Sequence, residues 1–386
     1  MEKLQDLLQN KESKWFKDTL KKRLVSVLET KETENVLNIL NKLSFTNLFA
    51  LLKFVLISKI TWDLSKKDIV RKSDSLFTKP KYVDILKLRN LEDKMLIEFL
   101  NNWFQYIEIS PLKPLWTSYI VWKNNPAKVI HTTNWFELMN DPTYSLTLEL
   151  VRKIRNNRNF EKEALITLST SIRNQKFNNP MYLPYFKTIS GSLVLPKKSK
   201  LKDLDGEISK IINLNIKFLN SLKQKGEISK ITLQLSNGKI LYEILKDELE
   251  LSDVDAKELV YNYRKKYWNW FTSKIFENLG ISIDYKFNIS NIKNSKYHKY
   301  FDNILKYIDS SLLSEVEIDF SRLAWIWHYN WTIFTLFISD NYWNTTDIVD
   351  GGSVNWINDL LSTKWYKQIV FGLWIELLSK FIDENK

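Results

Sequence analysis

The stretch Lys230-Ile-Thr-Leu-Gln-Leu-Ser236, followed by Asn237-Gly238 and by Lys239-Ile-Leu-Tyr-Glu-Ile244, carries the clearest strand pattern of the 386-residue chain. Apolar residues alternate with polar ones around the Asn-Gly pair. Such a pair is a strong hairpin signal, because both central residues of the tight turn need a positive φ. The sequence therefore predicts a β-hairpin over about 230–244. A lone hairpin is only marginally stable in water, so this one must pack on other elements.

Outside this stretch, the apolar residues mostly recur at intervals of three and four, which is typical of amphipathic helices. Ser252 with Asp255 resembles a capping box, and Gly280 stands where a helix C-cap would fall. The predicted fold class is mainly α, a multi-helix assembly with one small hairpin. Helices are expected over 45–60, 91–109, 143–157, 159–173, 204–225, 252–278, 297–313, 320–338 and 354–381.

Composition narrows the classes of function. The chain has 8 Gly among its 386 residues, which is about 2% against an average usage of about 7%. This low glycine content argues against folds built on glycine loops, such as Rossmann and P-loop domains. It has no Cys, which excludes disulfides, thiolate metal sites and a Cys nucleophile. The three histidines, His131, His298 and His328, are far apart in sequence. We therefore expect no metal site and no cofactor.

Proline, glycine and lysine mark one internal boundary. The segment 177–202 holds Pro180, Pro184, Gly191 and Pro196 and ends in four lysines. It predicts a basic linker or loop between an N-terminal helical region, 1–176, and a C-terminal helical region with the hairpin, 203–386. The start of the chain shows no secretory signal, and the longest apolar stretches carry charged or polar residues. The expectation is a cytoplasmic protein without integral membrane insertion.

The net charge of +12 is unevenly spread. Residues 152–202 contain twelve Lys and Arg against two Glu, whereas 309–359 contain eight acidic residues against one Arg. Arg152, Arg155 and Arg158 recur every three residues, so on a helix they share roughly one face, and the guanidinium fork suits phosphate. A second basic run lies among tyrosines and tryptophans at 261–270, as in single-strand binding sites, although an aromatic stripe at this spacing more often belongs to a core. The predicted nucleic-acid-binding residues are Arg152, Lys153, Arg155, Arg158, Arg173, Lys176, Lys197, Lys198, Lys200, Lys202, Arg264, Lys265 and Lys266.

These patterns favour a non-catalytic nucleic-acid-binding protein. Its expected partners are DNA or RNA and other protein subunits, because phosphate contacts by Lys and Arg give affinity for any sequence. By analogy of size and charge, we predict a helical subunit of a larger nucleoprotein complex, either a CRISPR-type effector of antiviral defence or viral or plasmid replication machinery.

Two alternatives stay open. Arg322-Leu-Ala-Trp-Ile-Trp-His328 is similar to the Arg, four to six residues, His pattern of HEPN ribonucleases, which are helical and metal-independent. The spacing of six puts Arg322 and His328 on different faces of a helix, so a buried histidine that bonds a backbone carbonyl is the preferred interpretation of His328. The other alternative is a protein–protein scaffold, because Trp356, Trp365 and Trp374 are nine apart in the last predicted helix.

Overall fold

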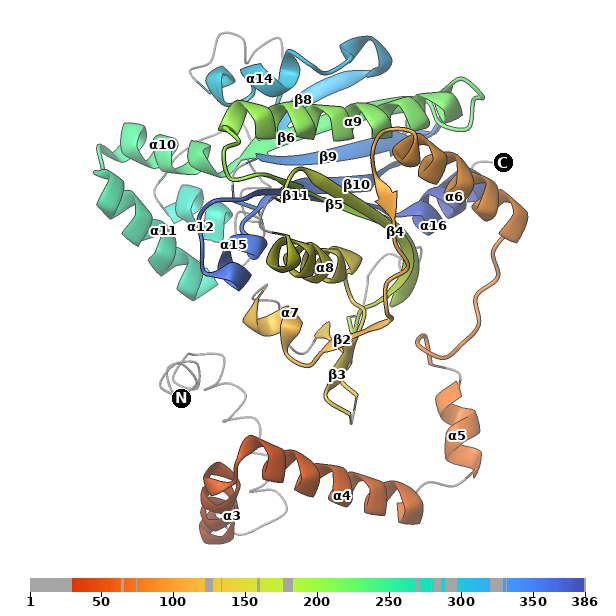
Figure 1. Cartoon of the computed structure of the whole chain (residues 1–386), viewed down its shortest axis with the longest axis vertical. Coiled ribbons are helices and arrows are strands. Elements are labelled where there is room, and N and C mark those ends of the chain that lie inside the picture. The colour runs from red at the N-terminus through yellow and green to blue at the C-terminus, as the bar shows by residue number, and fades with distance from the viewer. Residues whose placement is uncertain are drawn as a thin grey trace. The chain divides into compact units, whose positions relative to one another are not determined.

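The computed structural model of the chain describes residues 30–63, 66–73, 75–121, 128–132, 134–157, 160–175, 183–267, 271–278, 280, 286–288, 297–319, 329–330 and 332–384. Contacts between residues group the chain into two compact units, Met1–Lys79 and Pro80–Lys386. The described part of the first unit is helical (Figure 1). It contains α3 (Thr30–Lys42), α4 (Phe45–Asp63) and α5 (Lys66–Ser73).

The second unit is built on a large mixed β-sheet. Among the described residues the sheet has nine strands in the order β1-β4-β5-β11-β10-β9-β6-β8-β7. The pairs β1–β4 and β6–β8 are parallel and the others antiparallel. The strands are β1 (Gln105–Tyr106), β4 (Glu163–Ile172), β5 (Tyr185–Leu195), β6 (Lys230–Asn237), β7 (Lys286–Asn288), β8 (Glu315–Asp319), β9 (Thr332–Ser339), β10 (Thr345–Val354) and β11 (Lys367–Leu373). The prediction of a mainly α fold is therefore wrong, and the fold class is α/β.

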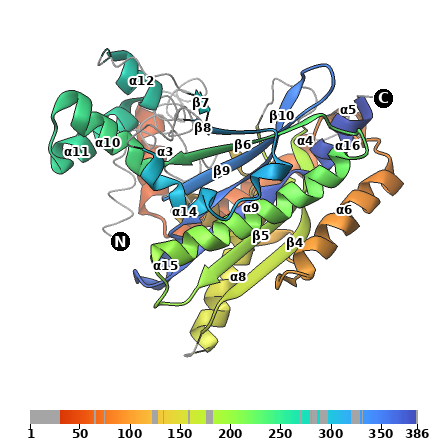
Figure 2. The same ribbon diagram turned by 90° about the horizontal axis from the view of Figure 1, so that it is seen from above.

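Helices cover both faces of this sheet. In Figure 1, α9 (Leu201–Lys223) lies above the strands and α8 (Pro142–Asn156) below them, and Figure 2 looks onto the face that α9 crosses. One large core joins that face to α9, α6 (Ile85–Leu100) and α16 (Ile375–Glu384). Smaller cores lie on the opposite face, beneath α8 and α15 (Trp356–Leu361).

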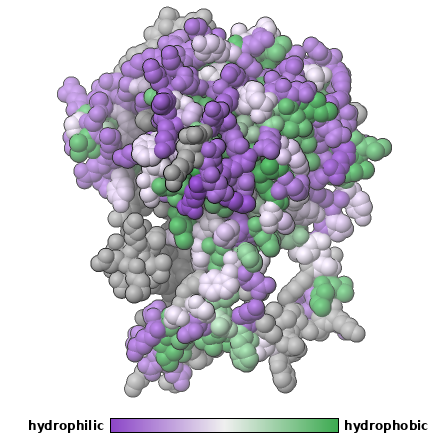
Figure 3. Space-filling view, viewed as in Figure 1, coloured by the Kyte–Doolittle hydropathy of each residue, from purple (hydrophilic) through white to green (hydrophobic). Residues whose placement is uncertain are grey.

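The remaining elements surround the sheet. They are β2 (Leu112–Pro114) paired with β3 (Phe136–Leu138), the helices α7 (Thr117–Ile120), α10 (Gly238–Leu249), α11 (Asp253–Tyr267), α12 (Phe271–Asn278) and α14 (Asp302–Leu305), and the 3-10 turns η3 (His298–Tyr300) and η4 (Ser310–Leu312). The surface in Figure 3 mixes hydrophilic and hydrophobic residues. No described helix combines the length and apolar character that a membrane crossing needs.

The predicted hairpin at 230–244 is wrong in its second half. Residues Lys230–Asn237 form the strand β6, which pairs with β9 and β8. Asn237 does not enter a turn. It keeps an extended backbone with φ −145°, and its side chain accepts a hydrogen bond from the Lys239 backbone N–H at 3.0 Å. Asn is a favoured helix N-cap, so the Asn-Gly pair starts helix α10 instead of turning the chain back.

Several predicted helices are strands for a common reason. The segment 159–173 contains β4, 320–338 contains β9, and 354–381 divides into α15, β11 and α16. Strands covered on both faces carry nearly continuous apolar runs, and such a run has no period that separates it from a buried helix. The helices expected over 45–60, 143–157 and 204–225 are confirmed as α4, α8 and α9.

The described part of 177–202 contains β5, which pairs with β4 on one side and β11 on the other. Gly191 stands within β5 because Phe371 of β11 lies against it, and a Cβ at Gly191 would come within 2.2 Å of the Phe371 ring. Two of the residues that suggested a boundary, Gly191 and Pro184, therefore lie in or next to the sheet.

Candidate functional site

The sheet face that α8 covers is rich in hydroxyl groups. Residues two apart on a strand share a face, which places Thr167, Ser169 and Ser171 of β4 on one side. Thr167 and Ser169 lie opposite Ser190 and Thr188 of β5. The hydroxyl oxygens of Thr167, Ser169 and Ser171 are buried, and the described residues offer them no hydrogen-bond partner. Buried polar groups normally have partners, so this strip is a candidate place for a bound molecule.

Ser171, Thr188 and Ser190 of this strip line a cavity of about 480 Å³, and we refer to it as the sheet cavity. The start of α8, the end of β4 and parts of β5, β10 and β11 line it. Its charged lining residues are Lys128, Asp141, Arg173, Asp347 and Asp350. Alternation would put Asp347 and Asp350 on opposite faces of β10. The register of β10 against β9 shifts between Asp347 and Val349, so both aspartates line the same cavity.

Arg173 follows β4 and is held on several sides. Its Nε donates a hydrogen bond to the Asn140 backbone oxygen at 3.1 Å. Its guanidinium lies 5.2 Å from the Phe186 ring centre and 5.4 Å from that of Trp374, and these two rings stack at 4.7 Å. Cation–π contacts and a fixed backbone acceptor orient the guanidinium, which can bind a carboxylate through two parallel hydrogen bonds.

Asp141 caps helix α8 and also approaches Arg173. Its Oδ1 accepts hydrogen bonds from the Thr143 backbone N–H at 3.0 Å and the Thr143 hydroxyl at 2.6 Å. Aspartate at the N-cap followed by proline at the first helical position is a favoured helix start. The other carboxylate oxygen, Oδ2, lies 4.0 Å from Arg173 Nη2.

Asp350 and Tyr329 also line the cavity. The Tyr329 hydroxyl donates a hydrogen bond to Asp350 Oδ2 at 3.3 Å. Burial, and then the negative charge of Asp350, raise the pKa of Tyr329 well above its ordinary value, so the phenol stays a donor. A Cβ at Gly352 would come within 2.7 Å of the Tyr329 ring, so this glycine makes room for the tyrosine. Gly351 and Gly352 belong to β10.

A buried lysine, Lys113, stabilises the part of the sheet-cavity wall that contains Asn140. Lys113 Nζ donates hydrogen bonds to the Ser118 hydroxyl at 2.7 Å and to the Asn140 side-chain oxygen, and it lies 3.4 Å from Glu137 Oε1. Burial lowers the pKa of Lys113 to about 8, although Glu137 acts in the opposite direction. Since the Asn140 carbonyl accepts from Arg173, the Lys113 network positions that arginine.

The structure separates the predicted nucleic-acid-binding residues. Arg152 and Arg155 are exposed on α8, where Arg152 pairs with Glu149 at 2.9 Å, and Lys153 pairs with Glu163 at 2.7 Å. Lys197 lies over the Trp365 ring at 3.8 Å, and Arg173 lines the sheet cavity. The residues that stay exposed next to the start of α9 are Lys198, Lys200 and Lys202.

Other predicted residues cannot be placed in a site. Arg158, Lys176, Arg322 and His328 lie outside the described residues, and the side chains of Arg264, Lys265 and Lys266 in α11 are not described. Nucleic-acid binding by the predicted set therefore stays a prediction.

The three tryptophans of the scaffold hypothesis do not share one helix. Trp356 is buried in α15, Trp365 is exposed in a loop and Trp374 lines the sheet cavity. Among the described residues, no three His, Asp or Glu side chains are grouped so that they could hold a metal ion.

The sequence patterns did not point to Asp141, Tyr329, Asp347 and Asp350, and Arg173 was predicted to bind nucleic acid. The one available signal was Asp350 next to Gly351-Gly352, because paired glycines in an apolar context can mark a close approach within a sheet.

The sequence matches no protein-family model and no curated protein. The fold does resemble solved structures. An ATP phosphoribosyltransferase regulatory subunit/histidyl-tRNA synthetase from Bacillus halodurans aligns with a TM-score of 0.59 at 14% identity, over 80% of this chain and 83% of that chain. A histidyl-tRNA synthetase from Nostoc sp. PCC 7120 aligns with a TM-score of 0.55 at 15% identity, over 80% and 75%. The apo enzyme from S. aureus aligns with a TM-score of 0.51 at 14% identity, over 79% and 72%.

These similarities overturn the predicted function. The prediction of a helical subunit of a CRISPR-type effector or of replication machinery, and with it the antiviral role, is wrong, because the chain does not have a mainly α fold. The ribonuclease and scaffold alternatives rested on the same helical fold. The chain instead has an α/β fold similar to that of histidyl-tRNA synthetases and of an ATP phosphoribosyltransferase regulatory subunit.

Proposed function

We propose that the Pro80–Lys386 unit binds a small zwitterionic molecule of the amino-acid type in the sheet cavity. The observation that carries the proposal is that Arg173 and Asp350 line the same cavity. A guanidinium held by backbone and aromatic rings suits the ligand's carboxylate. The carboxylate of Asp350 suits its ammonium group, and the hydroxyls of Ser171, Thr188 and Ser190 complete a polar lining.

The charge balance favours such a ligand over a polyphosphate. Three carboxylates, those of Asp141, Asp347 and Asp350, face two cations, Lys128 and Arg173, in the described lining. A nucleoside triphosphate brings several negative charges, which this lining would not neutralise. The cavity is thus better suited to holding an amino acid than to activating one with ATP.

The structural neighbours also support an amino acid as the ligand. All three are named as histidyl-tRNA synthetases, and one of them is also named as an ATP phosphoribosyltransferase regulatory subunit. We infer that histidine is the first ligand to test. We also infer that this chain acts as a regulatory subunit beside a separate catalytic protein. The predicted protein partner would then be that catalytic protein.

Calorimetric titration with histidine, followed by the other proteinogenic amino acids, tests the binding. Arg173→Gln and Asp350→Asn should each weaken binding by about tenfold or more, since each removes a hydrogen bond to a charged group. Arg155→Gln, an exposed arginine outside the cavity, is the control and should bind as the unchanged protein does. The proposal fails if no amino acid binds, or if the cavity variants and the control bind equally.

A second measurement separates binding from catalysis. Amino-acid-dependent exchange of pyrophosphate into ATP would show a synthetase activity and would contradict the regulatory assignment. Binding of an amino acid without exchange supports it. A mixture with an ATP phosphoribosyltransferase catalytic chain should then give a complex whose rate changes when the amino acid is added.

A further inference from the structure

A second cavity, of about 290 Å³, lies where β10 ends and β11 begins, and we refer to it as the strand-end cavity. It shares no lining residue with the sheet cavity. Its walls come from the end of β10, α15 with the loop that follows it, the first residues of β11, and Leu204 of α9. The proposed function assigns no role to this cavity.

Two polar groups in its wall have no hydrogen-bond partner among the described residues. Ser353 is 2% exposed, and its hydroxyl oxygen forms no hydrogen bond within the described part of the chain. The side-chain nitrogen of Asn330 is likewise buried and unpartnered there. The two residues are neighbours, because the Asn330 backbone N–H donates to the Ser353 carbonyl at 2.7 Å. Leaving two adjacent polar groups without partners costs stability, which points to a ligand that completes them.

Two lysines line the same cavity, Lys364 and Lys367, and neither forms an ion pair among the described residues. Ser353 pairs with Ile369 across β10 and β11. Lys367 is two residues from Ile369, so its side chain leaves the same face of the sheet as that of Ser353, and diagonal neighbours of this kind lie about 7–8 Å apart. A group of a few ångströms between them can reach both.

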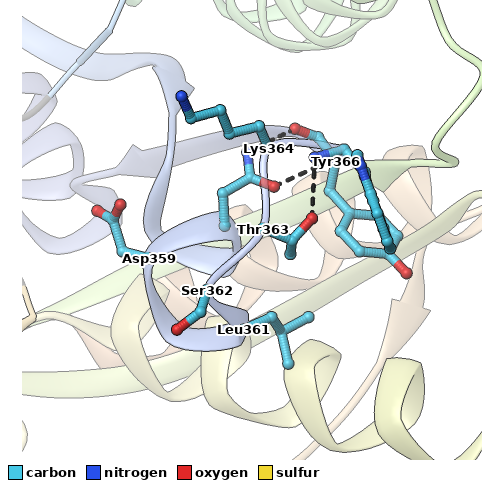
Figure 4. Close-up of a pocket in the computed structure, with 8 residues that line it drawn as sticks. Asp359, Leu361, Ser362, Thr363, Lys364 and Tyr366 are labelled. Carbon is cyan, nitrogen blue, oxygen red and sulfur yellow. Dashed lines mark hydrogen bonds between the residues drawn. The ribbon is translucent and has the colours of Figure 1, made fainter.

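Two other polar side chains of the wall, those of Asn358 and Thr363, are already engaged. Asn358 accepts from the Tyr366 backbone N–H at 3.0 Å and donates to the Tyr366 carbonyl at 2.9 Å. Figure 4 shows the loop with Thr363, Lys364 and Tyr366. Thr363 accepts from the Trp365 backbone N–H at 3.2 Å. These bonds hold the loop that carries Lys364. Two ammonium groups, the Asn330 amide NH2 and the Ser353 hydroxyl can therefore meet a ligand, and the described lining contains one carboxylate, that of Asp359.

We propose that the strand-end cavity binds a phosphate group. Lys364 and Lys367 supply the charge, and Asn330 and Ser353 supply neutral donors at the buried end. A phosphate group has enough acceptor oxygens to meet all four. The source of the group is either free inorganic phosphate or a small phosphomonoester.

The test is a calorimetric titration of the full chain at constant ionic strength, with inorganic phosphate in one arm and glycerol 3-phosphate in the other. The unchanged protein should bind at least one probe, and the tighter probe identifies the source. Ser353→Ala, and separately the pair Lys364→Gln with Lys367→Gln, should each weaken binding by about tenfold or more. Lys257→Gln, an exposed lysine on α11, is the matched control and should bind as the unchanged protein does.

Two further readouts keep the outcome clear. Ser353→Ala should not lower the unfolding midpoint in phosphate-free buffer, because the hydroxyl has no hydrogen bond to lose within the described part of the chain. All variants should keep their amino-acid binding, so failure at this cavity is distinguishable from failure at the sheet cavity. Absence of binding by both probes, or equal binding by the variants and the control, overturns the proposal.

Discussion

At the scale of single residues, Lys113 makes the clearest pH-dependent contribution. Its pKa is lowered to about 8 by burial, whereas an unfolded lysine titrates near 10.4. Between these values the unfolded chain binds more protons, so the free energy of unfolding should rise as pH increases from 8 to 10, by roughly 3 kcal/mol at most. Below pH 8 the group is charged in both states and adds no slope.

Urea unfolding at pH 7.5, 9 and 10 checks this expectation on the unchanged protein and Lys113→Met. The difference in free energy of unfolding between the two should change with pH, because the variant lacks the titrating group. Parallel pH profiles would contradict the assignment of the low pKa to this lysine.

The unpartnered hydroxyl of Thr167 gives a second prediction at this scale. Thr167 is fully buried and its Oγ1 has no partner among the described residues. Thr167→Val keeps the shape and removes that group, so the free energy of unfolding should rise by about 1 kcal/mol. Thr147 is the matched control, because its hydroxyl donates to the Thr143 carbonyl and accepts from Gln368. Thr147→Val should lower the free energy of unfolding, and equal effects at the two sites would contradict the hydrogen-bond assignment.

Individual residues of the site were only partly predictable. Arg173 attracted attention as a cation, but its role depends on Phe186 and Trp374, which reach it only through the folded sheet. Asn237 shows the opposite problem. Asn suits both a tight turn and a helix N-cap. Here it is an N-cap, because β6 pairs with β9 from a distant part of the sequence and not with the residues that follow it.

At the scale of elements, close packing between β5 and β11 depends on a glycine. Gly191→Ala would place a methyl group against the Phe371 ring, which cannot move freely because it stacks on Phe99 at 5.0 Å. The variant should lose about 1–3 kcal/mol of unfolding free energy, the usual cost of overpacking. Gly206→Ala on α9 meets nothing within 4 Å and should gain roughly 0.5–1 kcal/mol. Chemical unfolding of both variants measures the contrast, and a destabilised Gly206→Ala would contradict it.

Element prediction succeeded where one face is solvated. Helices α8 and α9 alternate buried and exposed faces, and their period is visible in the sequence. The strands β9 and β11 are buried along most of their length, so their apolar runs looked like helices. Periodicity cannot reveal a strand that helices or other segments cover on both sides.

At the scale of the whole molecule, the two compact units imply independent folding of the larger one. The segment that opens this unit is tied to α16 by ion pairs of Lys81 with Glu376 and Lys87 with Asp383, all within Pro80–Lys386. A protein of residues 80–386 should therefore unfold cooperatively near the midpoint of the full chain and bind the same amino acid. Circular dichroism and calorimetry check this. A broad transition or lost binding would show that Met1–Lys79 is needed for the fold of the larger unit.

Charge along the sequence was a poor guide to charge in the folded molecule. The basic segment 152–202 runs through α8, β4, β5 and the start of α9, so its Lys and Arg side chains extend from different helices and strands. Carboxylates from other parts of the chain then meet them, as Glu207 meets Lys162 at 2.6 Å and Glu92 meets Lys187 at 3.0 Å. Such pairings depend on tertiary structure, which a count of charges along the chain does not contain.

Trp374 lines the sheet cavity, and the Arg173 guanidinium lies over its ring, so the fluorescence of Trp374 can report binding in this cavity. Indole emission changes wavelength and intensity when the polarity and the charges around the ring change. A molecule that enters the cavity and draws the guanidinium toward its carboxylate therefore alters the fluorescence of Trp374. The difference spectrum between the unchanged protein and Trp374→Phe would isolate this signal from the other tryptophans, and occupancy could be followed in real time without any added label.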